Sequence, residues 1–142
     1  MTSDAQSEAE ELLQPLDDDQ CRRLLGSVQF GRVAVVEGGR PLIVVLNHVV
    51  DGNDVLFRTR ADARLARLTD GRIVHASFEV DSALPLGASG WSVIAVGHLA
   101  REHDEERQAR ARSTIKAWAE GDRDVVLRLE VHEVTGRSVG PI

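Results

Sequence analysis

The side chains best suited to chemistry follow an apolar segment that ends at Phe57. Arg58 and Thr59 come directly after it, and Arg64 lies in the first turn of a short helix predicted over residues 61–70. A junction of this kind offers free backbone N–H groups at the helix start, and the arginine and hydroxyl groups add further donors. The spacing therefore predicts a pocket for a phosphate group.

A solvated surface is an equally good interpretation of the same residues. Carboxylates that could pair with these arginines lie at Asp62, Asp70 and Glu79. Exposed ion pairs of this kind contribute little to stability and bind no ligand. Spacing alone leaves the phosphate pocket and the ion pairs as alternatives.

Other reactive side chains lack the spacing that common enzyme classes require. The five histidines lie far apart in the sequence without an HExxH motif, so no metal site is predicted. Ser92 lies in Gly-Trp-Ser-Val and not in the GxSxG of a nucleophile elbow. Cys21, the single cysteine, shares a helical face with Leu24 and Leu25, which is typical of a small core residue. A conventional hydrolase and an internal disulfide are therefore not expected.

The elements that would position these residues are mostly strands. Strand patterns cover residues 28–36, 41–50, 55–60, 72–80, 90–101 and 125–139. Gly-containing turns separate the first three segments, which predicts an antiparallel meander. Ile43 to Leu46 is apolar without alternation, as in a strand that is buried on both faces because a helix or a second subunit covers a closed barrel.

Three helices complete the pattern. Asp17 and Gln20 form a capping box for a helix that ends at Gly26, and a second short helix covers residues 61–70. A third is predicted from Asp104 to about residue 120, with Ala111, Ile115 and Trp118 on one face. Because strands follow one another without alternating helices, the fold class is mainly β, an antiparallel barrel of six or seven strands with about three peripheral helices.

Length and charge narrow the remaining possibilities. The 142 residues suffice for one domain, which we place at residues 16–142, after a polar and flexible N-terminal arm over residues 1–15. The net charge of −6 disfavours nucleic-acid and membrane-surface partners. No apolar run reaches the roughly 20 residues that span a bilayer, and the N-terminus does not read as a secretory signal, so a cytoplasmic protein is expected.

Several segments, taken in order, resemble the pyridoxamine 5′-phosphate oxidase-like flavoproteins from Leu16 to the C-terminus. The segments are LDDDQCRRLLGS, FGRVAV, PLIVVLNHVVDG, VLFRTRADARL, SFEVD, GWSVIAVGHL and VTGRSV. The resemblance implies an antiparallel split β-barrel and a homodimer with FMN between the two subunits. It does not extend to the C-terminal Arg-x-His pattern of true pyridoxamine phosphate oxidases, so it does not predict that substrate.

The resemblance also assigns residues to the cofactor. A strand segment would lie along the isoalloxazine ring, with polar contacts from its backbone and from one amide side chain: Val44, Val45, Leu46 and Asn47. The ring edge or the phosphate would be reached by Arg58, Thr59 and Arg64. Trp91 and Ser92 would approach the flavin from a neighbouring wall, and Trp118 from the partner subunit, although both tryptophans also fit a core or an interface.

The chemistry implied is transfer of hydride or electrons to or from a small conjugated substrate, carried by the flavin. On the same fold, the alternatives to FMN are the deazaflavin F420, haem or no cofactor. A non-catalytic flavin-storage or sensor protein is the alternative from another functional class.

Overall fold

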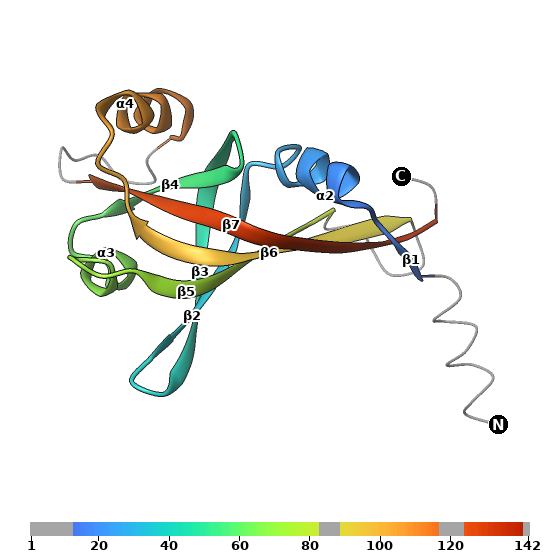
Figure 1. Ribbon diagram of the computed structural model, residues 1–142, viewed down its shortest axis with the longest axis horizontal. Helices are drawn as coiled ribbons and strands as arrows, with labels where there is room; N and C mark the ends of the chain where they lie inside the picture. Colours follow the sequence, from blue (N-terminus) through green and yellow to red (C-terminus); the bar gives the residue numbers. More distant parts are fainter. Residues whose placement is uncertain (1–12, 83–88, 117–123, 141–142) are drawn as a thin grey trace.

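The computed structural model describes residues 13–82, 89–116 and 124–140, and within them it contains seven strands and three helices (Figure 1). Their bounds are β1 Leu13–Pro15, α2 Asp18–Leu25, β2 Phe30–Glu37, β3 Arg40–Asp51, β4 Asp54–Arg60, α3 Arg64–Leu68, β5 Val74–Asp81, β6 Gly90–Arg101, α4 Glu105–Thr114 and β7 Asp124–Val139. The mainly β fold with peripheral helices is therefore confirmed.

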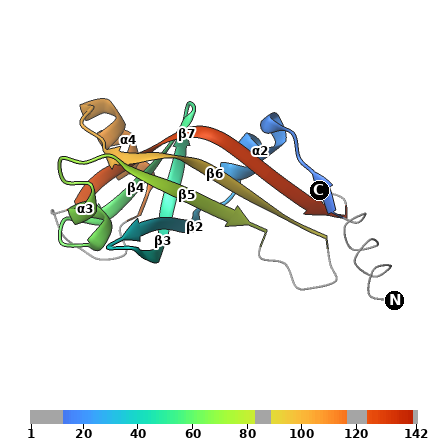
Figure 2. The ribbon, with the colours of Figure 1, turned by 60° about the horizontal axis from the view of Figure 1, so that its bottom comes forward.

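One antiparallel sheet closes on itself to form the barrel. Its strand order is β1-β7-β4-β3-β2-β5-β6, and a further pairing of β6 with β7 completes the ring. Of the two closing strands, β7 is the longest in the sheet with 16 residues, and it crosses the molecule side by side with β6 (Figures 1 and 2). Closure removes most of the free strand edges that a sheet of this size would otherwise expose.

The barrel opens around the hairpin of β2 and β3. A two-residue turn at Gly38 and Gly39, with φ values of 57° and 75°, joins these strands, and such positive angles are those of the hairpin turn that glycine favours. β2 pairs with β5 only over Arg32–Ala34, and β3 pairs with β4 only over His48–Asp51. The rest of the hairpin therefore projects from the barrel as a two-stranded arm (Figure 1).

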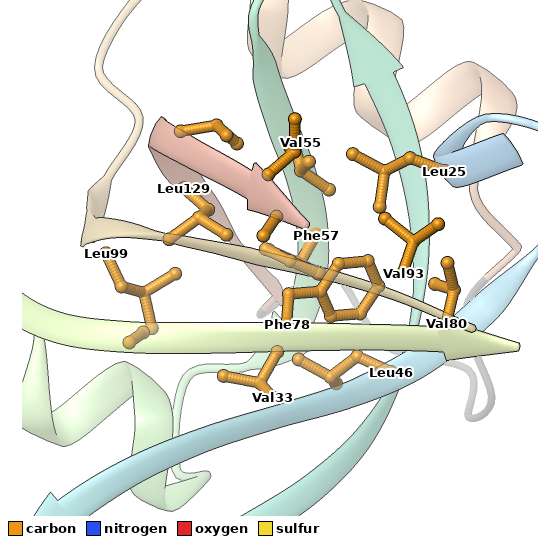
Figure 3. Close-up of a cluster of buried hydrophobic side chains, with 14 of the residues drawn as sticks. Leu25, Val33, Leu46, Val55, Phe57, Phe78, Val80, Val93, Leu99 and Leu129 are labelled. Atoms are coloured by element: carbon orange, nitrogen blue, oxygen red, sulfur yellow. The ribbon is translucent and has the colours of Figure 1, made fainter. Parts of the chain in front are cut away.

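The interior is filled by side chains that alternate along the strands. Phe57 and Phe78 are fully buried at its centre and meet edge to face, with ring centroids 5.0 Å apart (Figure 3). Val33, Leu46 and Val80 pack around them. Burial of large apolar side chains of this kind stabilises the fold by roughly 1.5–3 kcal/mol for each residue.

The helices cover separate parts of the barrel. The capping box predicted at Asp17 and Gln20 is present at the start of α2, and Cys21 is fully buried in the main core. On the outside of β4 and β7, α4 packs through Ala111 and Ile115 against Leu56. No helix within residues 13–82, 89–116 and 124–140 is long and apolar enough to cross a membrane.

Three details differ from the sequence-based expectations. Leu13–Pro15, placed in the flexible arm, pairs with Arg137–Val139 as strand β1. Helix α4 ends at Thr114 and not near residue 120, and Trp118 lies outside the described residues. The segment Ile43–Leu46 is not buried on both faces within one chain, because Ile43 and Val45 are 66% and 52% exposed.

Candidate functional site

The opening of the barrel leaves one edge of β3 without a strand partner among the described residues. The His48 N–H donates to the Gln29 carbonyl at 2.9 Å, so even-numbered residues of β3 direct their backbone groups toward β2. Backbone direction alternates along a strand, so Ile43, Val45 and Asn47 direct theirs to the opposite edge. Pro41 belongs to this same set, and a proline is tolerated where no ladder bond is required.

The predicted cofactor segment has two distinct faces. Val44 and Leu46 point into the barrel, where Leu46 is 7% exposed and belongs to the core. Val45 and Asn47 point outward, and their backbone N–H and C=O groups lie on the open edge. Of the four predicted residues, these two are therefore placed to contact a ligand with both side chain and backbone.

Asn47 and Arg58 lie together at the end of α4. They are the first residues beyond the His48–Phe57 pair that ends the β3–β4 ladder. The Asn47 Nδ2 donates to the Lys116 carbonyl at 3.5 Å, and the Arg58 Nη1 donates to the Ile115 carbonyl at 2.7 Å. The structure thus brings together two predicted site residues from different strands.

Arg58 is already engaged within the chain. Its guanidinium forms an ion pair with Asp124 at the start of β7. It also donates to the Arg112 carbonyl at 3.1 Å, so it satisfies two carbonyls near the C-terminal end of α4. A phosphate could bind Arg58 only by replacing these contacts, so the ion-pair interpretation describes Arg58 in the single chain.

Thr59 and Arg64 differ from Arg58 in position. Thr59 follows Arg58 on β4 and therefore points to the opposite face of the strand, where it is half-buried. Arg64 is the first residue of α3 and is exposed. Within the described residues its guanidinium has no ion pair or hydrogen bond, while Asp62 pairs with Arg60 at 3.0 Å. Arg64 is the cation of the predicted trio that is available to an anion.

Trp91 and Ser92 lie at the start of β6. The Trp91 side chain packs against the main core, and the Trp91 backbone N–H donates to the Ser82 Oγ at 3.1 Å. Ser92 faces outward, opposite Asp81 on β5 and Arg137 on β7. Ser92 therefore shares the outer surface with Val45 and Asn47, whereas Trp91 has a structural position.

Sequence reasoning missed an apolar surface around these residues, which we call the outer apolar face. Its members are between 39% and 68% exposed and lie on strands β2, β3 and β6, on the same side of the sheet: Phe30, Val36, Ile43, Val45, Ile94 and Val96. The sequences of β2 and β6 could have indicated this surface, since apolar side chains occur on both faces of these strands. A group of exposed large apolar side chains with polar residues around it is typical of an interaction site.

A charged group interrupts the outer apolar face. The Arg32 Nη1 lies 3.1 Å from both Glu79 and Asp81 on the neighbouring strand. Partial burial and the nearby Asp81 carboxylate outweigh the Arg32 guanidinium and raise the pKa of Glu79. One arginine thus pairs with two carboxylates of β5, which lie between the apolar side chains of β2 and those of β6.

Comparison with known proteins gives consistent results. The family model for pyridoxamine 5′-phosphate oxidase matches residues 17–138. An uncharacterized protein of Mycobacterium tuberculosis is 34% identical over 124 residues, which cover 85% of this chain and 82% of that protein.

Two solved structures share the fold. A FAD-binding protein from Mycobacterium smegmatis is 29% identical, with a TM-score of 0.70 over 88% of this chain and 96% of that one. A FAD-binding protein from Mesorhizobium loti has a TM-score of 0.75 at 19% identity, over 91% of this chain and 99% of that one.

Proposed function

Because this chain belongs to the pyridoxamine 5′-phosphate oxidase family, we propose that it binds a flavin, with the ring along the open edge of β3 and a second copy of the chain closing the site. FMN is the flavin that we assign. The observation that carries the proposal is the unpaired edge of β3 next to the outer apolar face.

The open edge suits the polar rim of a flavin ring. An isoalloxazine carries carbonyl and N–H groups along one side and is flat and apolar elsewhere. Val45 and Asn47 direct backbone donors and acceptors to this edge, and the Asn47 side chain adds an amide. Preformed backbone groups of this kind bind and orient a cofactor without a cost for ordering long side chains.

The phosphate of the flavin would bind at Arg64. Its guanidinium is exposed, and phosphate accepts bidentate hydrogen bonds from arginine. Thr59 could donate a hydroxyl nearby. We assign Arg58 to the ring end of the site, beside Asn47, where its fixed position near the α4 end supplies a positive charge.

A homodimer would cover the outer apolar face. Six large apolar side chains are exposed there, and within residues 13–82, 89–116 and 124–140 the projecting β2–β3 arm has no further strand partner over much of its length. A two-stranded arm is marginally stable in water by itself. A second copy that packs on this face would bury the arm and place Ser92 near the ligand.

Bound flavin would supply hydride or electron transfer to a small conjugated substrate, which makes the protein an oxidoreductase. The chain's own residues would bind and orient the ring and exclude water from it. FAD is a second candidate, because this chain is similar to a FAD-binding protein from M. smegmatis. F420 is the third.

The first experiment identifies the ligand. Purified protein should show a flavin absorption spectrum, or acquire one when FMN is added, and mass spectrometry of the released ligand should distinguish FMN, FAD, F420 and haem. A colourless protein that binds none of them in titrations would refute the proposal.

The second experiment tests the open edge itself. Val45→Pro removes one N–H from the open edge without breaking a β2–β3 hydrogen bond, and Val45→Ala removes the same side chain but keeps the N–H. We expect Val45→Pro to weaken flavin binding by roughly tenfold, as for loss of one buried hydrogen bond, and Val45→Ala to weaken it less. Fluorescence titration measures both. Equal affinities for the two variants would place the ring elsewhere.

A further inference from the structure

Three of the five histidines meet in a row across neighbouring strands, although they are far apart in the sequence. His75 on β5 lies directly opposite His98 on β6, and their ring centroids are 4.7 Å apart. The His98 ring lies 4.5 Å from that of His132 on β7. A carboxylate belongs to the same group, since the Glu130 Oε1 is 3.2 Å from the His132 Nε2.

A β-bulge places the third ring. Val96 pairs with Glu133 and Gly97 pairs with Val131, so His132 is the extra residue of β7. A Cβ atom at Gly97 would lie 1.8 Å from the Glu130 carbonyl oxygen, so only glycine allows β6 and β7 to approach this closely. Bulges of this kind redirect side chains and occur often beside functional sites.

We propose that His75, His98 and His132, together with Glu130, bind a divalent transition-metal ion such as Zn²⁺. His98 is the ligand common to the two adjacent pairs, His75–His98 and His98–His132. Imidazole nitrogen is the most frequent protein ligand for these ions. Two imidazoles on one tetrahedral zinc have ring centroids about 5 Å apart, given Zn–N bonds of about 2.0–2.1 Å. The observed separations of 4.7 Å and 4.5 Å lie close to this value.

Small movements of the rings complete the site. Among the described residues no three histidine, cysteine or carboxylate side chains converge on one point as a preformed metal site. His75 and His132 are exposed and His98 is half-buried, and the terminal torsion of a histidine ring rotates over a broad range at low cost. Metal binding therefore requires rotation of side chains and no change in the strands. This site is independent of the proposed flavin.

The test is a calorimetric titration of Zn²⁺ into metal-free full-length protein purified without a histidine tag. His98→Ala should weaken binding by roughly tenfold or more, because it removes the shared ligand. His132→Ala changes an exposed ring on the bulge, so it should weaken binding without disturbing the fold. His103→Ala, an exposed histidine outside the row, is the matched control and should bind as the wild type does.

Imidazole proton resonances provide a second readout. Zn²⁺ should shift the signals of His75, His98 and His132 and leave those of His48 and His103 in place. If the wild type and His98→Ala bind Zn²⁺ equally, or neither binds it, the row has only a structural role and the proposal is wrong.

Discussion

Single residues of the same type have different environments in this protein. Arg58 is engaged by Asp124 and by two carbonyls at the end of α4, while Arg64 is exposed and, among the described residues, has no partner. His48 is 7% exposed and its Nε2–H donates to the Leu25 carbonyl at 2.8 Å. Residue type alone therefore does not decide which of them is available to a ligand.

Arg64→Ala should weaken FMN binding by roughly tenfold or more, the usual effect of one charge-assisted hydrogen bond. Riboflavin, which lacks the phosphate, should bind both proteins equally. Fluorescence titrations of the two ligands measure the difference. Arg72→Ala, another exposed arginine, is the matched control. Equal losses for FMN and riboflavin would show that Arg64 does not contact the phosphate.

His48 should make stability depend on pH. Burial outweighs the opposing effect of the Leu25 and Gln29 backbone groups and lowers the pKa of His48, and its Nδ1 is buried without a hydrogen-bond partner among the described residues. As the pH falls below the unfolded value of about 6.5, the unfolded chain takes up a proton that the folded chain resists. The contribution of His48 to the free energy of unfolding should therefore be complete above that pH. It should decrease as the pH falls, until the folded pKa is reached.

His48→Gln removes this titration while an amide N–H can still donate to the Leu25 carbonyl. Urea unfolding at about pH 7.5 and about pH 5.5 should show a smaller difference for the variant than for the wild type. The same pH dependence in both proteins would mean that other groups cause it.

At the scale of elements, α4 is attached to the barrel by charge at both ends. Near its start, Arg107 lies within 3.2 Å of Asp51, Asp54 and Glu102. Burial opposes ionisation of Glu102, but the Asp104 N–H and the guanidinium groups of Arg128 and Arg107 outweigh it and lower its pKa. The helix therefore holds the β3–β4 turn at one end and the region of Asn47 and Arg58 at the other.

Arg58→Ala should lower the free energy of unfolding by about 1–3 kcal/mol, because the carbonyls at the α4 end lose their donor and Asp124 keeps only its longer ion pair with Arg112. Arg58→Lys keeps the charge but not the planar geometry, so it should lower stability less. Urea unfolding curves of the three proteins give the comparison. If Arg58→Ala has the same free energy of unfolding as the wild type, Arg58 belongs to the solvated surface and is free to bind phosphate.

At the scale of the whole molecule, the barrel conceals its core but not its outer apolar face. The strands around the opening expose Phe30, Ile43 and Val45, while the open edge of β3 lies beside them. An exposed apolar edge of this kind invites pairing or aggregation when nothing covers it. A second copy of the chain would cover it and close the proposed flavin site at the same time.

Ile43→Glu should raise the dissociation constant of the proposed dimer by roughly a hundredfold, because the glutamate charge would be buried without a partner. Ile73→Glu is the matched control, since Ile73 is 70% exposed but lies outside the outer apolar face. Analytical ultracentrifugation measures the association, and bound flavin should decrease with it. Ile43→Glu that assembles like Ile73→Glu would remove this face from the interface.

The sequence by itself determined most of the segments that become strands and helices, but not β1 or the end of α4. The capping box at Asp17 and Gln20, the Gly38–Gly39 turn and the burial of Cys21 all follow from local spacing, because caps, turns and side-chain periodicity depend on near neighbours. The ordered resemblance from Leu16 onward likewise predicted the family that the comparison identified. The individual contacts of the predicted site residues remain predictions.

Only the tertiary structure decided what those segments bring together. Arg58 meets Asp124, and His75 meets His98 and His132, across strands that are distant in the chain. Ladder register and the β-bulge place these groups, and both arise from long-range pairing that no local pattern encodes. For the same reason the open edge of β3 could not be read from its apolar run, since it depends on where β4 parts from β3.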